Sequence, residues 1–162
     1  MKPGFPSEYG AGDFYAAIDK PTDAVAARTE IATPGEPIGS VLTISSFEDD
    51  HVTLKQMLHG LTRMVPQART YQQALERVRA EDISVLICER NLPDGSWKDV
   101  LSAVAVKSSP PAVIVACRLA DEHLWAEVLN LGGYDVLAKP FDAKEVLWTV
   151  NHACCRRRMA EI

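Results

Sequence analysis

The chain has 162 residues, of which 47% are hydrophobic and 24% are charged, and its formal net charge is -5. This length and composition fit one ordinary globular domain, and no apolar run approaches the ~20 residues that a membrane-spanning helix needs. The acidic balance disfavours general nucleic-acid binding, and the first residues do not form a basic stretch followed by an apolar run, as a secretion signal would. We therefore expect a cytoplasmic protein that binds neither nucleic acid nor membrane.

The first part of the chain differs in composition from the rest. Residues 1–39 contain five prolines, five glycines and scattered acidic residues, without a sustained hydrophobic period. This composition predicts a flexible, disordered leader. Its apolar cluster Phe14–Ile18 is a candidate partner-binding motif, although such clusters also arise by chance in linkers. We expect a leader over 1–39, a folded domain over 40–158 and a tail over 159–162.

From Ser40 onward, short apolar runs alternate with amphipathic segments, a pattern that is typical of βα units. We expect strands near 41–45, 65–68, 84–88, 113–116 and 135–138, and helices near 50–61, 71–80, 97–106, 121–131 and 142–157. Strict alternation indicates an α/β fold with a five-stranded, doubly wound parallel sheet and five helices. Sites in such sheets form outside the C-terminal strand ends, where residues 45–50, 89, 116–117 and 139 should lie.

Four cysteines occur, Cys88, Cys117, Cys154 and Cys155, without the paired spacing of a metal site. Buried strand cysteines usually behave as small hydrophobic residues, so we expect reduced, buried thiols. A thiol redox switch between Cys88 and Cys117, at the ends of neighbouring strands, is a weaker hypothesis.

Several sequence blocks occur together in the second half. The strand Ser84–Cys88 is followed by Glu89 and then by Leu92-Pro93-Asp94-Gly95, and the later stretch Leu131–Ala138 is followed by Lys139-Pro140-Phe141. In this combination, residues 40–158 resemble the receiver domain of two-component response regulators. The resemblance implies a flavodoxin-like strand order 2-1-3-4-5 and a role in phosphorelay signal transduction.

The resemblance also implies a phosphorylation pocket. Family members accept a phosphoryl group from a partner histidine on an aspartate that ends the third strand. That aspartate and an acidic pair after the first strand hold Mg²⁺, which prefers oxygen ligands. A Thr or Ser on the fourth strand and a Lys before Pro contact the phosphoryl oxygens, and an aromatic residue on the fifth strand reports the state.

Most of this set is replaced here. The acceptor position matches Glu89, the acidic pair matches Ser45 and Ser46, the Thr/Ser position matches Ala116 and the switch position matches Val136. The lysine is retained as Lys139, followed by Pro140. Glu48, Asp49 and Asp50 read as a solvated helix start, because acidic residues suit a helix N-terminus. Together with Glu89 they are the candidate ligands for residual, weak Mg²⁺ binding.

These replacements predict a Glu89–Lys139 ion pair to which Ser45 and Ser46 add hydroxyl hydrogen bonds, with no metal and no cofactor required. The leading hypothesis is a pseudo-receiver that is not an enzyme and acts through protein–protein interaction. The alternatives are an active phospho-acceptor that uses Glu89 or the nearby Asp94 with Mg²⁺, and the redox switch. Whether Glu89 imitates the phosphorylated state is left open by the sequence.

The resemblance further implies a partner surface made by the fourth helix, fifth strand and fifth helix. On the fourth helix, Leu124, Val128 and Leu131 should face the sheet, which turns Trp125 toward its edge. On the fifth helix, Trp148 lies away from the core positions Val146 and Val150. Because Trp is enriched in binding hot spots, we expect this face to bind a histidine kinase, another regulator or a second copy in a homodimer.

Overall fold

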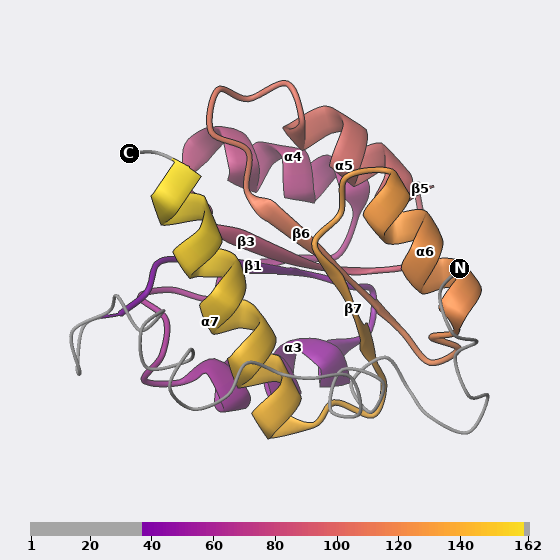
Figure 1. The fold of residues 1–162 in the computed structure, drawn as a ribbon, viewed down its shortest axis with the longest axis horizontal. Helices are drawn as coiled ribbons and strands as arrows, with labels where there is room; N and C mark the ends of the chain where they lie inside the picture. Colours follow the sequence, from indigo (N-terminus) through magenta and orange to yellow (C-terminus); the bar gives the residue numbers. More distant parts are fainter. Residues whose placement is uncertain (1–36, 161–162) are drawn as a thin grey trace.

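The computed structural model describes residues 37–160, and element labels follow Figure 1. The predicted leader lies almost entirely outside the described residues, as does the end of the predicted tail. The central sheet has five parallel strands in the order β2-β1-β3-β6-β7, which confirms the expected order 2-1-3-4-5. Its strands are β1 (Val41–Ile44), β2 (Gln67–Ala68), β3 (Val85–Glu89), β6 (Ala112–Cys117) and β7 (Asp135–Ala138).

Five helices cover the two faces of the sheet, as expected for a doubly wound fold (Figure 1). The helices α4 (Tyr71–Ala80), α5 (Trp97–Val104) and α6 (Glu122–Asn130) lie on one face, and α3 (Glu48–Leu58) and α7 (Ala143–Ala160) lie on the other. A small antiparallel hairpin, β4 (Asn91–Leu92) and β5 (Gly95–Ser96), was not predicted. It follows β3 directly and leads into α5.

The strands are mostly apolar because the sheet is buried on both faces. In β3, Leu86 and Cys88 belong to the core under α4, α5 and α6, whereas Val85 and Ile87 belong to the core under α3 and α7. Consecutive side chains of a strand alternate between faces, so an uninterrupted apolar run fills both layers. Glu89 ends this run and is the first residue of the strand with a charged side chain.

Polar caps start three of the helices at the C-terminal edge of the sheet. The side chain of Thr70 accepts a hydrogen bond from the Gln73 amide, and that of Asp121 accepts one from the Leu124 amide. Ser96 and Asp99 form a reciprocal capping box at the start of α5. Such caps satisfy amides that lack a partner within the helix. They fix where each helix begins beside the predicted functional edge.

The two tryptophans proposed for the partner surface differ in burial. The expectation that Trp125 turns toward the surface was wrong, because it is 6% exposed within the core of the α4–α5–α6 face. The buried stripe of α6 runs through Leu124, Trp125 and Val128, whereas Leu131 follows the last helical residue and is 53% exposed. Trp148 is half-buried on α7 and stacks on the ring of His152, with centroids 4.1 Å apart.

Over residues 37–160, the longest helix is α7, and neither it nor any other helix has the length and apolar character needed to cross a bilayer.

We predict that Trp125→Ala destabilises the fold by about 3–5 kcal/mol, because it removes a large side chain from a close-packed core. Trp148→Ala, at a half-buried position on the other face, should cost less. Urea-induced unfolding followed by far-UV circular dichroism measures both. An unchanged unfolding midpoint for Trp125→Ala would contradict this placement of its ring.

Candidate functional site

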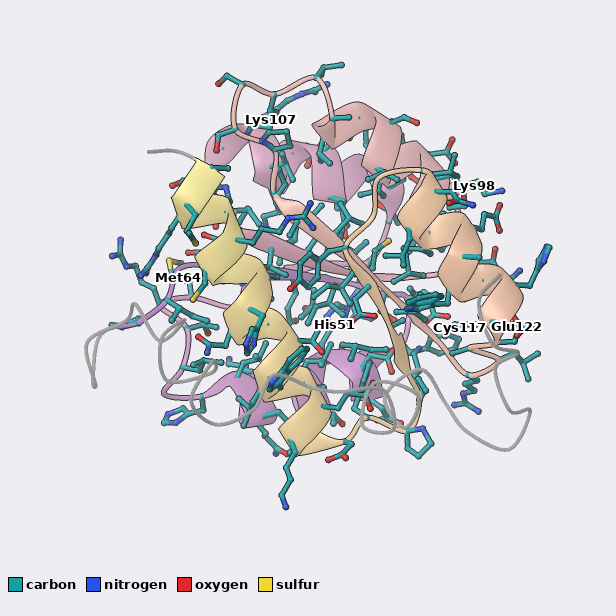
Figure 2. All side chains as sticks on the ribbon, viewed as in Figure 1. His51, Met64, Lys98, Lys107, Cys117 and Glu122 are labelled. Atoms are coloured by element: carbon teal, nitrogen blue, oxygen red, sulfur yellow. The ribbon has the colours of Figure 1, made fainter. Side chains whose placement is uncertain are left out.

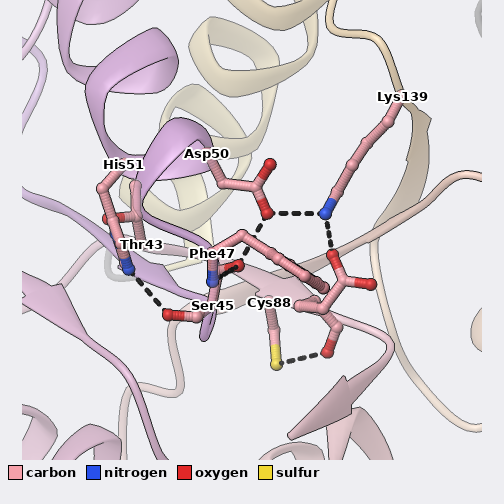
Figure 3. Close-up of polar contacts among 8 residues, drawn as sticks. Thr43, Ser45, Phe47, Asp50, His51, Cys88 and Lys139 are labelled. Carbon is pink, nitrogen blue, oxygen red and sulfur yellow. Dashed lines mark hydrogen bonds and ion pairs between the residues drawn. The ribbon is translucent and has the colours of Figure 1, made fainter.

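A lysine ammonium lies between two carboxylates at the C-terminal edge of the sheet (Figure 3). Lys139 directly follows β7, Glu89 ends β3, and Asp50 lies in the first turn of α3. Lys139 Nζ is 2.5 Å from Asp50 Oδ2 and also forms an ion pair with Glu89 Oε2. The three side chains are 7%, 12% and 13% exposed for Lys139, Glu89 and Asp50, respectively. The predicted Glu89–Lys139 pair is therefore confirmed as a mostly buried contact.

Asp50 was assigned to a solvated helix start, and that expectation was wrong. Its carboxylate accepts a hydrogen bond of 2.6 Å from the Ser45 hydroxyl, in addition to the contact with Lys139. A usable signal was present: Asp50, Leu54 and Leu58 are spaced at i, i+4 and i+8, and both leucines are buried. The face of α3 that enters the core therefore carries Asp50 to the edge of the sheet.

The two serines play different parts from the ones expected. Ser45 is buried and binds Asp50 instead of the Glu89–Lys139 pair, and it also accepts a 3.0 Å hydrogen bond from the Phe47 amide. Ser46 is exposed. The pocket therefore holds two carboxylates and one ammonium. The expected arrangement of one carboxylate facing one ammonium leaves out Asp50.

The other two acidic residues of this segment face solvent. Glu48 and Asp49 are exposed in the first turn of α3, where acidic side chains suit the helix dipole. Glu48 forms an ion pair with Arg69 at the surface. For these two residues the predicted solvated helix start is confirmed.

The excess carboxylate changes the electrostatics of Glu89. Burial away from water raises the pKa of Glu89, the hydrogen bond and positive charge of Lys139 oppose this, and the negative charge of Asp50 adds to the rise. Arg118, exposed just beyond β6, opposes the rise from a longer distance. Desolvation is the largest effect, so the ion pair with Lys139 does not fully compensate the buried charge.

An open pocket of about 440 Å³ lies beside this cluster, between the start of α3 and the segment after β7. Asp50, Lys139 and Arg118 contribute to its lining, together with Pro140 and Phe141. The ring of Phe47, which is 51% exposed, lies with its centroid 5.0 Å from Lys139 Nζ. This cation–π contact adds to the restraints on the ammonium group.

The remaining family positions offer no polar group to the pocket. Ala116 lies opposite Glu89 in the β3–β6 register and is 3% exposed, so it presents a methyl group where the family has a hydroxyl. Val136 is 1% exposed in the core of the α4–α5–α6 face. Neither side chain can contact a phosphoryl oxygen through a hydrogen bond.

His51 is a residue of this region that the sequence reasoning missed. It is fully buried on α3, and its ring nitrogens lie 2.7 Å from the Thr43 hydroxyl and 2.7 Å from the Ser45 carbonyl oxygen. Figure 2 shows it in the interior of the molecule. The imidazole donates to the carbonyl through Nε2 and thereby links α3 to the end of β1, next to Ser45.

Asp94 is placed away from the pocket. Its carboxylate accepts hydrogen bonds from the backbone amides of Tyr71 (2.7 Å) and Gln72 (3.0 Å) at the start of α4. Desolvation acts against it, but these hydrogen bonds lower the pKa of Asp94. Its oxygens cap a helix, which does not favour a role as substitute phospho-acceptor.

The cysteines give no geometric support to the redox hypothesis. All four are free and buried, and burial raises the pKa of Cys88 well above its usual range. Cys88 is paired in the sheet with Val115, two residues before Cys117. A buried thiol with a raised pKa is a poor nucleophile for disulfide exchange.

The donor set does not fit a resident Mg²⁺. Within residues 37–160, no group of three or more His, Cys, Asp or Glu side chains is arranged to hold a metal ion. The two carboxylates that meet in the pocket both contact Lys139, and its ammonium lies where it would repel a divalent cation.

We predict that Lys139→Met destabilises the protein by about 3–5 kcal/mol, because it leaves two buried carboxylates without a counter-charge. Lys144→Met, on the exposed start of α7, is the matched control and should be close to neutral. Adding Glu89→Gln to Lys139→Met should recover part of the loss. Chemical denaturation measures all three variants, and equal stability of the two lysine variants would refute the role given to Lys139.

We also predict the sign of a pH dependence. Because the folded state raises the pKa of Glu89 above its ordinary value of 4.5, the folded protein holds a proton that the unfolded chain has released. The contribution of Glu89 to the unfolding free energy should therefore fall as pH rises from that value through the raised pKa. Glu89→Gln should remove this slope.

The measurement is the difference in unfolding free energy between the parent and Glu89→Gln, at pH values from about 4 to 8. Most other carboxylates titrate in both proteins and cancel. A difference that increases with pH in favour of the parent would mean that the Lys139 contact outweighs desolvation.

Comparisons with known proteins identify relatives of this chain in sequence and in fold. The chain is 27% identical over 126 residues to the regulatory protein VirG of Agrobacterium fabrum, covering 74% of this chain and 47% of the relative. It is 25% identical to the transcriptional regulatory protein ZraR of Klebsiella oxytoca, covering 76% of this chain and 28% of the relative. The chain thus spans about a quarter to a half of these curated relatives.

The fold is shared with a solved receiver domain. The signal receiver domain of a LuxO repressor protein from Vibrio parahaemolyticus superposes with a TM-score of 0.70 at 22% identity, covering 75% of this chain and 94% of that structure. The sequence model of the response regulator receiver domain matches residues 44–151, which contain the end of β1, the other four strands of the sheet, α3, Glu89 and Lys139. This chain therefore belongs to the response regulator receiver domain family.

Proposed function

We propose that this receiver domain works in two-component signalling as a pseudo-receiver, which signals by binding a protein partner and does not accept a phosphoryl group. The observation that carries the proposal is the placement of Lys139 between Asp50 and Glu89. The ammonium occupies the centre of the cluster and binds both carboxylates.

The chemistry of phosphoryl transfer supports the proposal. Catalysis of that reaction depends on positioning and on cations and donors that stabilise the transferring group. Ala116 offers no hydroxyl, and Lys139 is already engaged by two carboxylates. Glu89 places its oxygens ~1.5 Å further out than an aspartate would, and a displacement of about 1 Å can cost ~100-fold in rate.

The state of the pocket follows from the same contact. With Glu89 paired to Lys139, the pocket would not enter a phosphorylation cycle. The packing of Val136 in the core, in place of an aromatic switch residue, agrees with a domain that is held in one conformation. In this proposal the domain acts as a constitutive binding module and not as an enzyme.

A second candidate function is favoured by Asp50. Its carboxylate brings a second acid to Glu89, which the sequence did not predict, and so restores part of the acidic environment in which receivers bind Mg²⁺. In this alternative, Asp50 and Glu89 would hold Mg²⁺, which would supply positive charge to the phosphoryl group, and Glu89 would be the acceptor in place of its contact with Lys139. Breaking the ion pairs of Lys139 with Asp50 and Glu89 would cost free energy, so the pseudo-receiver is the preferred proposal.

The partner in this proposal is a protein in the cytoplasm: a histidine kinase, another regulator or a second copy of the chain. The proposed surface is the face formed by α6, β7 and α7. Trp125 is removed from it by burial, whereas Trp148 remains half-buried on α7 and is the aromatic anchor that we propose.

We predict that no acyl phosphate accumulates when the full chain is incubated with acetyl phosphate and Mg²⁺. Intact-mass spectrometry is the readout, with Glu89→Gln as the control. Calorimetric titration should show Mg²⁺ binding weaker than about a millimolar. A phosphoryl mass gain in the parent that is absent from Glu89→Gln would establish the active-acceptor alternative instead.

A further inference from the structure

A groove lies at the N-terminal edge of the sheet, opposite the Lys139 cluster. We call it the Arg63 groove; it has a volume of about 420 Å³ and runs between Pro37–Ser40, Arg63–Met64 and the end of α7. Figure 2 shows Met64 at the opposite end of the molecule from Cys117, which ends β6 at the functional edge. The groove is therefore distinct from the receiver pocket.

The groove has a positive charge, because both of its acidic residues are neutralised by ion pairs with arginines. Of its two acidic residues, Asp82 pairs with Arg157 at 2.9 Å and Glu81 pairs with Arg77 at 2.9 Å. Arg63 and Arg158 also line it, and neither forms an ion pair with another residue of the 37–160 range. Two arginines are thus left to meet an anionic ligand, in a protein whose net charge is -5.

The groove also offers an apolar surface. Met64 is 55% exposed, and its backbone is positioned by the β-bridge between Ser40 and Met64. Methionine adapts to irregular apolar partners. A ligand that carries both apolar and acidic side chains would therefore match this surface better than a simple anion would.

A segment with this chemistry is joined to the groove. Residues 1–36 contain six acidic and three basic residues, so their net charge is -3, and they enter the described domain at Pro37, which lines the groove. The apolar cluster Phe14–Ile18 is flanked by Asp13 and Asp19. Positions 20 to 36 make up 17 residues, and random-coil scaling gives a peptide of that length an end-to-end distance of roughly 20–25 Å, which is sufficient to return to the groove.

We propose that the segment Asp13–Asp19 docks in the Arg63 groove of the same chain, with its aspartates facing Arg63 and Arg158 and its apolar side chains covering Met64. Tethering makes this contact intramolecular, so a modest intrinsic affinity is sufficient to occupy the groove. The docked segment would exclude other acidic peptides from this edge. This inference does not depend on whether Glu89 accepts a phosphoryl group.

The test measures hydrogen exchange of the amides of residues 13–19 in the full chain by mass spectrometry. In the parent, these amides should exchange more slowly than in a free peptide of the same sequence. Arg63→Glu with Arg158→Glu should accelerate their exchange about fivefold, as expected for the loss of two exposed ion pairs. Asp13→Arg with Asp19→Arg should do the same, and combining all four changes should restore protection.

Arg79→Glu is the matched control, because Arg79 is an exposed arginine of α4 that does not line the groove, and it should leave protection unchanged. Thermal unfolding checks that the Arg63 and Arg158 variants fold, and the Asp13 and Asp19 variants leave the described domain intact. Free-peptide exchange rates in the parent, or protection that charge reversal does not alter, would overturn the proposal. Protection that disappears on dilution would also overturn it, by assigning the contact to a second copy.

Discussion

The buried ammonium of Lys139 is the constraint on which this end of the molecule depends. It joins three elements that are distant in sequence, because Asp50 belongs to α3, Glu89 to β3, and Lys139 to the segment after β7. A charge at this depth is tolerated only when it is paired, and here one cation serves two anions. The Ser45 hydroxyl and the more distant Arg118 each moderate the remaining negative charge, and the Phe47 ring stabilises the ammonium.

The replacements in the pocket are consistent with one another when they are considered as a set. Serines take the positions of the acidic pair at Ser45 and Ser46, and Asp50 enters from α3 to share the lysine with Glu89, whose pKa its negative charge raises. Under the proposed function, Ala116 would need no hydroxyl, because no phosphoryl oxygen would be bound. The chain keeps the backbone fold of a receiver, and the polar side chains at the C-terminal edge of its sheet form hydrogen bonds and ion pairs with one another.

The fold was predictable because its main signal is hydrophobic period. Alternating apolar runs and amphipathic segments gave the sequence of strands and helices and most helix limits, whereas the strand order was implied by the family resemblance. Leu54 and Leu58 are buried as their spacing predicted. The polar details depend on tertiary contacts that the period does not encode. Asp50 shares the leucine face but ends beside Lys139, 89 residues away, and Trp125 is buried because the α6 stripe is wider than one row of side chains. His51 gave no local signal, since its partners lie on another element.

The distribution of the tryptophans gives each face of the sheet its own optical reporter. Trp97 and Trp125 are 2% and 6% exposed in the core beneath α4, α5 and α6, whereas Trp148 lies half-buried on α7 across the sheet. Indole emission depends on local polarity, so the first two report from a dry environment and the third from a partly hydrated one. A change in the emission of Trp148 alone therefore identifies an event on the α3–α7 layer, without any added dye or label.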